Sequence, residues 1–330
     1  MKVVIVGVHG HMGIVFRDLE RCPGVEIVGI APGSPDEDVL RRAEMWKPRF
    51  PHMKVFEDYR KMADEVKPDI AAVGSYYYLN GKITIEMLQR GIHCLSEKPS
   101  ALTLEGLQEL RSAYGKSGVE YAAMLEMRYQ PPFLAAYNEI RKGSIGQPLM
   151  ATAQKTYKLG ERSYIFRNRS CYGGTIPFVG IHGIDLLMWV MGSPVETIFA
   201  RHTRKGNRGH GELESCAVVS LSFSNKTFAS ANIDFLNPEK APAHSDDRIR
   251  IAGEKGVIEV KDGKTVLMTN DAEPVIIDQA PSRFFFPDFI SQIEKRGSCL
   301  VTAQDSFLAT EVVLNARLAA DREENINIGI

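Results

Sequence analysis

Hydrophobic and polar positions alternate in blocks along the first third of the chain. Short apolar runs, such as Lys2–Val6 and 69–74, are typical of strands buried in a parallel sheet. Between these runs, apolar residues recur at helical spacing, first at Met12, Val15, Phe16 and Leu19. Strands and helices continue to alternate up to a sixth strand at 119–124, and this order predicts a doubly wound parallel sheet.

The pattern changes near residue 125, where alternation of period two takes over. Apolar residues from Ala217 to Phe223 share one face, Asn225 and Lys226 form a turn, and 248–260 has the pattern of a second hairpin. Two helices, at about 287–296 and 303–320, close the chain. We therefore expect a doubly wound parallel domain over 1–124 and a second domain over 125–330, with a largely antiparallel sheet and helices on one side.

Composition and charge limit the classes of function. A length of 330 residues suits two domains, and a net charge of −1 provides no global field for nucleic acid or membranes. Five scattered cysteines without a CxxC pair indicate neither a disulfide framework nor a metal site. No secretory peptide precedes the first strand, and the longest apolar stretch, around 176–191, carries His182 and Asp185. We expect a soluble cytoplasmic protein.

A glycine-rich turn follows the first strand and opens the first helix. Gly7, Gly10 and Gly13 are spaced as G-x-x-G-x-x-G, in the strand–turn–helix context of a dinucleotide site. The helix N-terminus offers free N–H groups to a pyrophosphate. Pro32 stands near the position where NAD-binding units carry an acid, and Ser34 suits either a ribose hydroxyl or a 2′-phosphate. The sequence therefore leaves NAD and NADP open and predicts only mild discrimination between them.

Glu97-Lys98-Pro99 follows the fifth predicted strand. In open α/β sheets, ligands bind beyond the carboxyl ends of the strands, where a lysine can exchange a proton with a substrate. Strand alternation should point Glu97 and Lys98 to opposite sides. An ordinary exposed lysine at the start of a loop is the alternative.

A second group of chemically active residues begins at Gly173-Gly174 and continues into the apolar stretch. If this stretch is helical from about residue 178, Phe178, His182 and Asp185 lie on one face. A histidine with a carboxylate one turn away suits proton transfer. A structural histidine that bridges two elements explains the same pattern.

Together these motifs resemble the glucose–fructose oxidoreductase/inositol dehydrogenase (Gfo/Idh/MocA) family. The matching pieces are the glycine turn, Glu97-Lys98-Pro99, Arg128-Tyr129, Gly143-Ser144-Ile145-Gly146, Gly173-Gly174 and Gly180-x-His182-x-x-Asp185. The resemblance implies that 1–124 is a Rossmann domain and that 125–330 is an α/β domain with a large, mostly antiparallel open sheet, which forms homodimers or homotetramers. It also implies NAD(P)-dependent oxidation or reduction at a carbinol of sugars, cyclitols and related polyols.

The resemblance further implies that Lys98 and His182 are the catalytic pair. Residues expected at the cofactor are Gly7, His9, Gly10, His11, Met12, Gly13, Ser34, Ser75, Tyr76, Asn80, Glu97, Lys98 and Arg128. Residues expected at the substrate are Lys98, Arg128, Arg167, Arg169, Phe178, His182 and Asp185. Arg167 and Arg169 suit surface salt bridges equally well.

Phe178 departs from the family pattern, since an aspartate is common at that position. Its ring cannot stabilise an imidazolium, so we expect a mainly neutral His182 that hydrogen-bonds the substrate while Lys98 carries the proton. Lys98 must lose its own proton first, and its free pKa of about 10.4 is lowered by desolvation and by oxidised nicotinamide. The alternative is a catalytically silent nucleotide- and sugar-sensing protein, which Phe178 favours and the presence of both Lys98 and His182 opposes.

Overall fold

The chain folds into two units, which the computed structural model describes over residues 1–278 and 282–329. The first contains Met1–Met124 and Phe284–Phe307, and the second contains Leu125–Arg283 and Leu308–Ile330. The expected boundary after residue 124 coincides with this division, but Phe284–Phe307 returns to the first unit. There the Phe307 ring stacks on Tyr121 at 5.4 Å between centroids. Local periodicity cannot reveal on which unit a late helix packs.

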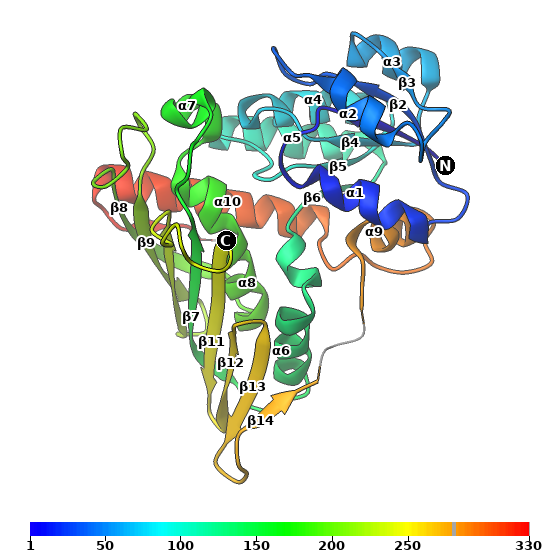
Figure 1. Cartoon of the computed structure of the whole chain (residues 1–330). Coiled ribbons are helices and arrows are strands. Elements are labelled where there is room, and N and C mark those ends of the chain that lie inside the picture. The colour runs from blue at the N-terminus through cyan, green and yellow to red at the C-terminus, as the bar shows by residue number, and fades with distance from the viewer. Residues whose placement is uncertain (279–281, 330) are drawn as a thin grey trace. The chain divides into compact units, whose positions relative to one another are not determined.

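The first unit contains a six-stranded parallel sheet of order β3-β2-β1-β4-β5-β6 (Figure 1). This is the doubly wound order of a Rossmann fold, which confirms the predicted fold class. Its strands are β1 (Lys2–Val6), β2 (Glu26–Ala31), β3 (Lys54–Val55), β4 (Ile70–Val73), β5 (His93–Ser96) and β6 (Tyr121–Ala123). The side chains of β4 are all buried, as the apolar run predicts.

Helices of the first unit begin where the sequence provides a cap. Asp58 accepts the N–H groups of Arg60 and Lys61 at the start of α3, and Thr103 caps α5 in the same way. The helices and short turns are η1 (Gly10–Met12), α1 (Gly13–Asp18), η2 (Leu19–Arg21), α2 (Val39–Trp46), α3 (Tyr59–Val66), α4 (Tyr77–Gln89), α5 (Leu104–Ser117) and α9 (Phe285–Ile293). Helix α4 begins at Tyr77, shortly after the end of β4.

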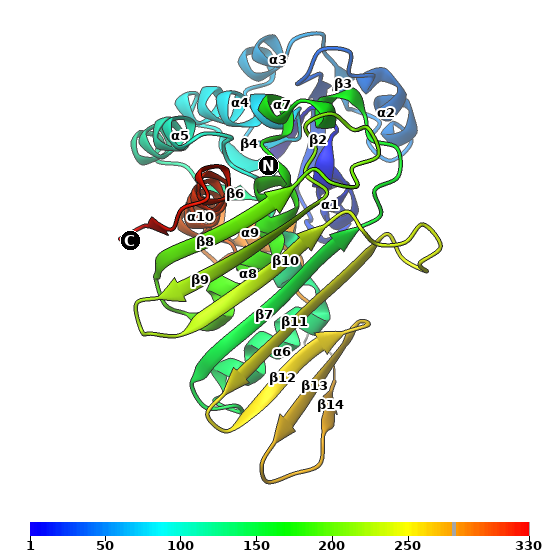
Figure 2. The ribbon, with the colours of Figure 1, turned by 90° about the vertical axis from the view of Figure 1, so that its left-hand side faces the viewer.

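The second unit contains a nine-stranded sheet of order β14-β13-β12-β11-β7-β10-β9-β8-β15, as Figure 2 shows, with α6 and α8 behind it. All neighbours are antiparallel except β7 and β10. The strands are β7 (Pro148–Tyr157), β8 (Val195–Thr203), β9 (Cys216–Phe223), β10 (Phe228–Asp234), β11 (Ser245–Gly253), β12 (Gly256–Lys261), β13 (Lys264–Thr269), β14 (Val275–Ile277) and β15 (Ile326–Asn327). The mostly antiparallel sheet is confirmed.

The helices of the second unit are η3 (Glu126–Tyr129), α6 (Pro131–Arg141), η4 (Tyr164–Arg167), α7 (Arg169–Tyr172), η5 (Ile176–Gly180) and α8 (Ile181–Met191). Helix α10 (Ala303–Arg322) begins in the first unit and continues in the second. The segment Arg169–Met191 is long and apolar enough to cross a membrane, but 89% of its apolar 18-residue stretch is buried inside the protein. It is a core segment of the second unit.

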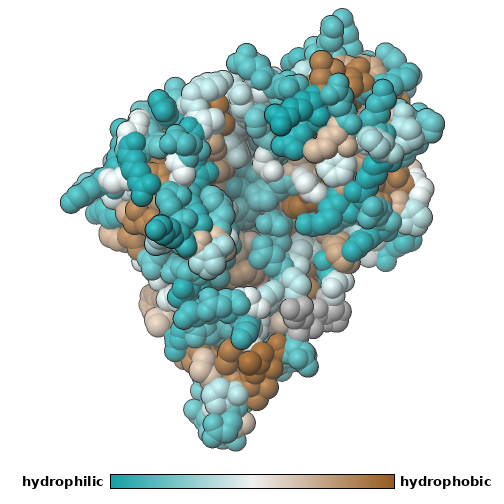
Figure 3. Space-filling model, in the orientation of Figure 1, coloured by the Kyte–Doolittle hydropathy of each residue, from teal (hydrophilic) through white to brown (hydrophobic). Residues whose placement is uncertain are grey.

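One apolar patch is visible near β14 (Figure 3). Val275 and Ile276, which belong to that edge strand, are 50% and 60% exposed. Exposed apolar side chains on an edge strand are an exception to the polar edges that most sheets carry.

Candidate functional site

The glycine turn of the first unit requires glycine at two of its three positions. Gly7 and Gly10 have φ values of +78° and +68°, which L side chains rarely adopt. A β-carbon on Gly7 would lie 2.5 Å from the Gly74 carbonyl oxygen, and one on Gly10 would overlap the Glu97 side chain. At Gly13, the first residue of α1, a β-carbon would meet nothing within 4 Å. The turn is therefore packed on the sheet and open at the start of the helix.

Glu97 anchors this turn to the end of β5. Its carboxylate is buried and accepts the backbone N–H of His11 at 2.8 Å, while the His11 Nδ1 lies 2.9 Å from the same oxygen. Burial opposes the charge, but His11 and then Lys98 lower the pKa of Glu97 below its ordinary value. His11 is thus part of the turn's attachment rather than a freely projecting loop side chain.

Lys98 is 1% exposed, and its Nζ lies 3.9 Å from Glu97 Oε1. The expectation that the two side chains point to opposite sides is therefore wrong. Strand β5 ends at Ser96 and the chain bends at Lys98, so strand alternation no longer applies. The alternative of an exposed lysine is also wrong.

A carboxylate does lie beside the ends of β1 and β2, although no acid occupies the position near Pro32. Glu37 folds back so that Oε1 accepts from Val8 N at 2.5 Å and Oε2 accepts from Gly33 N at 2.9 Å and Ser34 N at 3.1 Å. Its side chain is 2% exposed. The neighbouring Asp38, not Glu37, caps α2. The premise that this edge lacks an acid is wrong.

The loop after β4 is held by side-chain contacts with the backbone. Asn80 Oδ1 accepts from Ser75 N at 2.8 Å, and Ser34 Oγ accepts from Tyr76 N at 2.7 Å. The Tyr76 ring lies 4.7 Å from the His9 ring. Met12 fills the space over Gly74, where a β-carbon would overlap its side chain. Residues that the sequence placed at the cofactor thus meet at the carboxyl edge of the parallel sheet.

These residues fit a dinucleotide. Two buried polar atoms at this edge, Ser75 Oγ and Asn80 Nδ2, make no hydrogen bond within residues 1–278 and 282–329. Backbone N–H groups at the start of α1, the Ser75 hydroxyl and the Asn80 amide would hold the cofactor, and Glu37 offers a carboxylate for ribose.

In the second unit, a π-type turn precedes the helix that carries His182. The turn η5 covers Ile176–Gly180, and α8 begins at Ile181. Pro177 has no amide hydrogen for a regular α-helical bond, and a side chain on Gly180 would overlap Ile233. Because a π turn is wider than an α turn, the expected single helical face from Phe178 to Asp185 is not regular.

Asp185 and Arg128 form a buried bidentate ion pair. Arg128 donates from Nε and from an amino nitrogen to the two Asp185 oxygens, at 2.9 and 2.6 Å, and its guanidinium lies 5.2 Å from the Trp189 ring. The exposed fractions of the two side chains are 4% and 1%. This pair fastens η3 to α8, which favours the interpretation of Asp185 as a brace of the helix.

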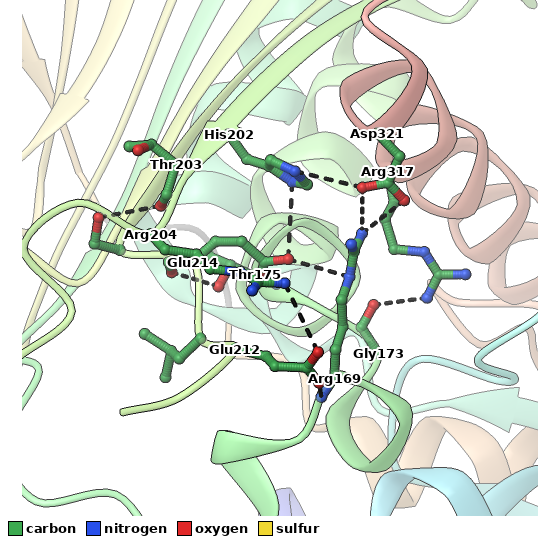
Figure 4. A network of polar contacts seen from close by, with 12 residues as sticks. Arg169, Gly173, Thr175, His202, Thr203, Arg204, Glu212, Glu214, Arg317 and Asp321 are labelled. Atoms are coloured by element: carbon green, nitrogen blue, oxygen red, sulfur yellow. Dashed lines mark hydrogen bonds and ion pairs between the residues drawn. The ribbon is translucent and has the colours of Figure 1, made fainter. Parts of the chain in front are cut away.

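A network of charged side chains holds the Gly173-Gly174 segment that leads into η5 (Figure 4). The buried Glu214 carboxylate accepts from the Tyr172 hydroxyl at 2.6 Å and from Thr175 N at 2.9 Å. Arg169 Nε lies 3.1 Å from the other oxygen. A β-carbon on Gly174 would be 3.2 Å from Arg169 Nε, so glycine leaves room for the pair. Burial raises and these donors lower the pKa of Glu214, with a net decrease.

The same network involves His202, Arg317 and Asp321. The second amino group of Arg169 binds Asp321 at 2.8 Å, and Arg317 donates to the Gly173 carbonyl at 2.7 Å. The Asp321 carboxylate also lies 3.4 Å from His202 Nε2. These ion pairs favour the salt-bridge role for Arg169 over substrate binding. Arg167, at the end of η4, is exposed.

A family model matches each of the two units. The oxidoreductase family with an NAD-binding Rossmann fold matches residues 1–124, and the GFO/IDH/MocA C-terminal domain matches residues 133–259. A putative oxidoreductase of known structure from Thermotoga maritima is 38% identical over 99% of this chain and all of its own, with a TM-score of 0.95. The chain belongs to the Gfo/Idh/MocA family. Its first unit is an NAD-binding Rossmann domain of an oxidoreductase.

More distant relatives include enzymes with named substrates. The inositol 2-dehydrogenase of Klebsiella pneumoniae is 24% identical, over 81% of this chain and 77% of its own. An oxidoreductase from Agrobacterium radiobacter, solved in complex with NAD+, L-tartaric acid and magnesium, is 16% identical with a TM-score of 0.86, over 100% of this chain and 98% of its own. The likeness to the Agrobacterium radiobacter structure shows the fold alone.

Two buried carboxylates of the candidate site, Glu37 and Glu214, were not predicted from the sequence. Glu37 lies among three consecutive acidic positions, and that pattern indicates only the start of a helix. Glu214 contacts a segment 39 residues away and has no local signal. Neither contact follows from spacing along the chain.

Proposed function

We propose that this protein is an NAD(P)-dependent oxidoreductase acting on a CH–OH group. It would transfer a hydride between nicotinamide and a secondary alcohol or carbonyl carbon of a sugar, cyclitol or related polyol. The observation that carries the proposal is the buried Lys98, which follows β5 at the sheet edge where Glu97 holds the glycine turn. Membership of an oxidoreductase family and the polyol-dehydrogenase relative support it.

Lys98 and His182 are the proposed catalytic pair. The bound cofactor supplies the hydride acceptor. Lys98 takes the hydroxyl proton during oxidation and returns it during reduction, and the Glu97 carboxylate at 3.9 Å stabilises the ammonium formed. His182, which is 1% exposed on α8, hydrogen-bonds the reacting hydroxyl or relays its proton.

The sheet of the second unit suggests how copies of this chain would assemble. We propose a cytoplasmic homodimer or homotetramer that assembles through the open face of the nine-stranded sheet and binds neither nucleic acid nor membranes. Large apolar side chains on strands of that sheet support an interface, since Met150, Phe199, Val218 and Phe228 are 49%, 38%, 36% and 56% exposed.

The test is turnover with NAD or NADP across a panel of polyols, sugars and sugar acids, followed by nicotinamide absorbance. Wild type should turn over at least one compound, and Lys98→Met should abolish this turnover while it still binds NADH, as measured by fluorescence. Lys82→Met, an exposed change on α4 of the same unit, is the matched control and should keep activity.

One observation favours a second candidate function, that of a catalytically silent nucleotide- and sugar-sensing protein, called the sensor below. Phe178 is 8% exposed and packs against Phe166 and Tyr172, with ring centroids 5.0 and 6.1 Å away. An aromatic wall binds a sugar face without requiring proton transfer. Tight cofactor binding without turnover of any panel member would establish the sensor and refute the enzyme.

A further inference from the structure

Lys155 and Asp247 form an ion pair inside the second unit that the proposed chemistry does not use. They are register partners on β7 and β11, and Lys155 Nζ lies 2.6 Å from Asp247 Oδ2. Their side chains are only 6% and 13% exposed, and Nζ also lies 4.7 Å from the centre of the Tyr157 ring. Replacing such a pair by apolar residues is often neutral or stabilising, so stability alone does not explain its presence.

The pair lies next to the segment that carries His182. A β-carbon on Gly183, the residue after His182, would be 3.8 Å from the Lys155 β-carbon. Lys155 is also the register partner of Ile233, which packs against Gly180 in the π-type turn. The ion pair therefore lies directly beneath the start of the helix that bears the proposed catalytic histidine.

Asp247 also lines a cavity of about 490 Å³ within the second unit. The volume suits a small ligand. Other residues of its wall are Gln130, Phe133, Asn237, Ser245 and Val260. While Oδ2 accepts from Lys155, Oδ1 makes no hydrogen bond within the described parts of the chain.

The surroundings of Asp247 do not fully offset the free-energy cost of burying its charge. Burial raises the pKa of Asp247, and Lys155 together with the nearby Ser245 hydroxyl offsets this only in part. A buried acceptor without a donor costs free energy, and a hydroxyl group from a ligand would remove that cost.

The charges around the cavity disfavour anions. Asp246, Asp247 and Asp262 line it, with Arg248 as the cation among the lining residues. Arg248 is already bound to Asp246 at 2.6 and 2.7 Å. A carboxylate of a ligand would thus meet net negative charge, whereas a neutral hydroxyl would meet an acceptor.

We propose that Asp247, held in place by Lys155, is a substrate subsite that accepts a hydroxyl of an uncharged polyhydroxylated substrate and selects it over sugar acids. The proposal rests on the function proposed above and specifies the substrate class. Lys155 acts through Asp247 and is a positioning residue.

The experiment compares wild type with Asp247→Asn. The control is Asp234→Asn on β10 of the same sheet, where Asp234 accepts from Thr156 and does not line this cavity. Steady-state kinetics with neutral polyols and sugar acids would be combined with calorimetric binding of both classes to the NADH-loaded protein. Asp247→Asn should raise KM or Kd for neutral compounds about 10- to 100-fold with little change in kcat. It should also reduce the preference for neutral over acidic compounds at least tenfold, while the control keeps wild-type values.

A double variant, Lys155→Met with Asp247→Leu, removes both charges and guards against misfolding by an unpaired buried charge. It should bind NADH normally and lose binding of neutral compounds. The subsite would be overturned if wild type prefers sugar acids, or if Asp247→Asn changes KM or Kd for neutral compounds less than twofold. A fall in kcat with unchanged KM would also overturn it. If wild type turns over nothing, the proposed enzyme fails, but the calorimetry still decides the subsite.

Discussion

Glu37 should give this protein a clear preference for NAD over NADP. Its carboxylate lies at the ends of β1 and β2, held by the backbone N–H groups of Val8, Gly33 and Ser34 at 2.5 to 3.1 Å. That edge is where the ribose of the adenosine is bound in doubly wound folds. Ribose hydroxyls can donate to the remaining lone pairs of the carboxylate, whereas a 2′-phosphate presents like charge.

The size of the preference follows from Coulomb's law. Two unit charges about 5 Å apart at an effective dielectric constant of about 20 repel by about 3 kcal/mol. Each 1.4 kcal/mol is a tenfold change in affinity, so NADPH should bind on the order of 100-fold more weakly than NADH. This replaces the mild discrimination expected from Pro32.

Fluorescence titration of NADH and NADPH measures the preference directly. Glu37→Gln keeps the side-chain length and one of the two oxygens that accept from backbone N–H groups, but removes the charge. It should tighten NADPH binding at least tenfold and weaken NADH binding a few-fold. Glu44→Gln, an exposed change on α2, should leave both affinities unchanged. Equal affinities in wild type, or a ratio unaffected by Glu37→Gln, would refute the reasoning.

Three further outcomes are expected. Lys98→Met should reduce kcat far more than His182→Asn, which keeps a hydrogen-bonding group; the reverse order in steady-state kinetics would contradict the assigned roles. Glu214→Gln should lower stability by about 1.5 kcal/mol in denaturant unfolding, because the hydrogen bonds to Glu214 lose their charge while Arg169 keeps Asp321, and exposed Glu196→Gln should not. Phe228→Glu should dissociate the proposed oligomer in sedimentation experiments, and an unchanged mass would contradict the proposed interface.

Much of the fold follows from the sequence alone, because its signals are local. The buried apolar run of β1, the last helix α10 and the hairpin of β9 and β10 lie close to their predicted positions. Such elements are set by side chains within a few residues of each other. The order of motifs from the glycine turn to His182 also identified the family, since each motif occupies a definite place along the chain.

Only the tertiary structure showed which partners the buried carboxylates contact, because those partners lie far away in the sequence. Glu97 reaches back 86 residues to His11, Glu37 reaches 29 residues to Val8, and Glu214 reaches 39 residues to Thr175. None of these partners can be read from periodicity, because periodicity reports which face a residue occupies and not what lies opposite. The sequence by itself therefore determined the two-unit α/β architecture and its candidate catalytic residues. Only the folded chain decided which carboxylates hold the glycine turn, the strand ends and the Gly173-Gly174 segment, because charge partners are chosen by packing in three dimensions.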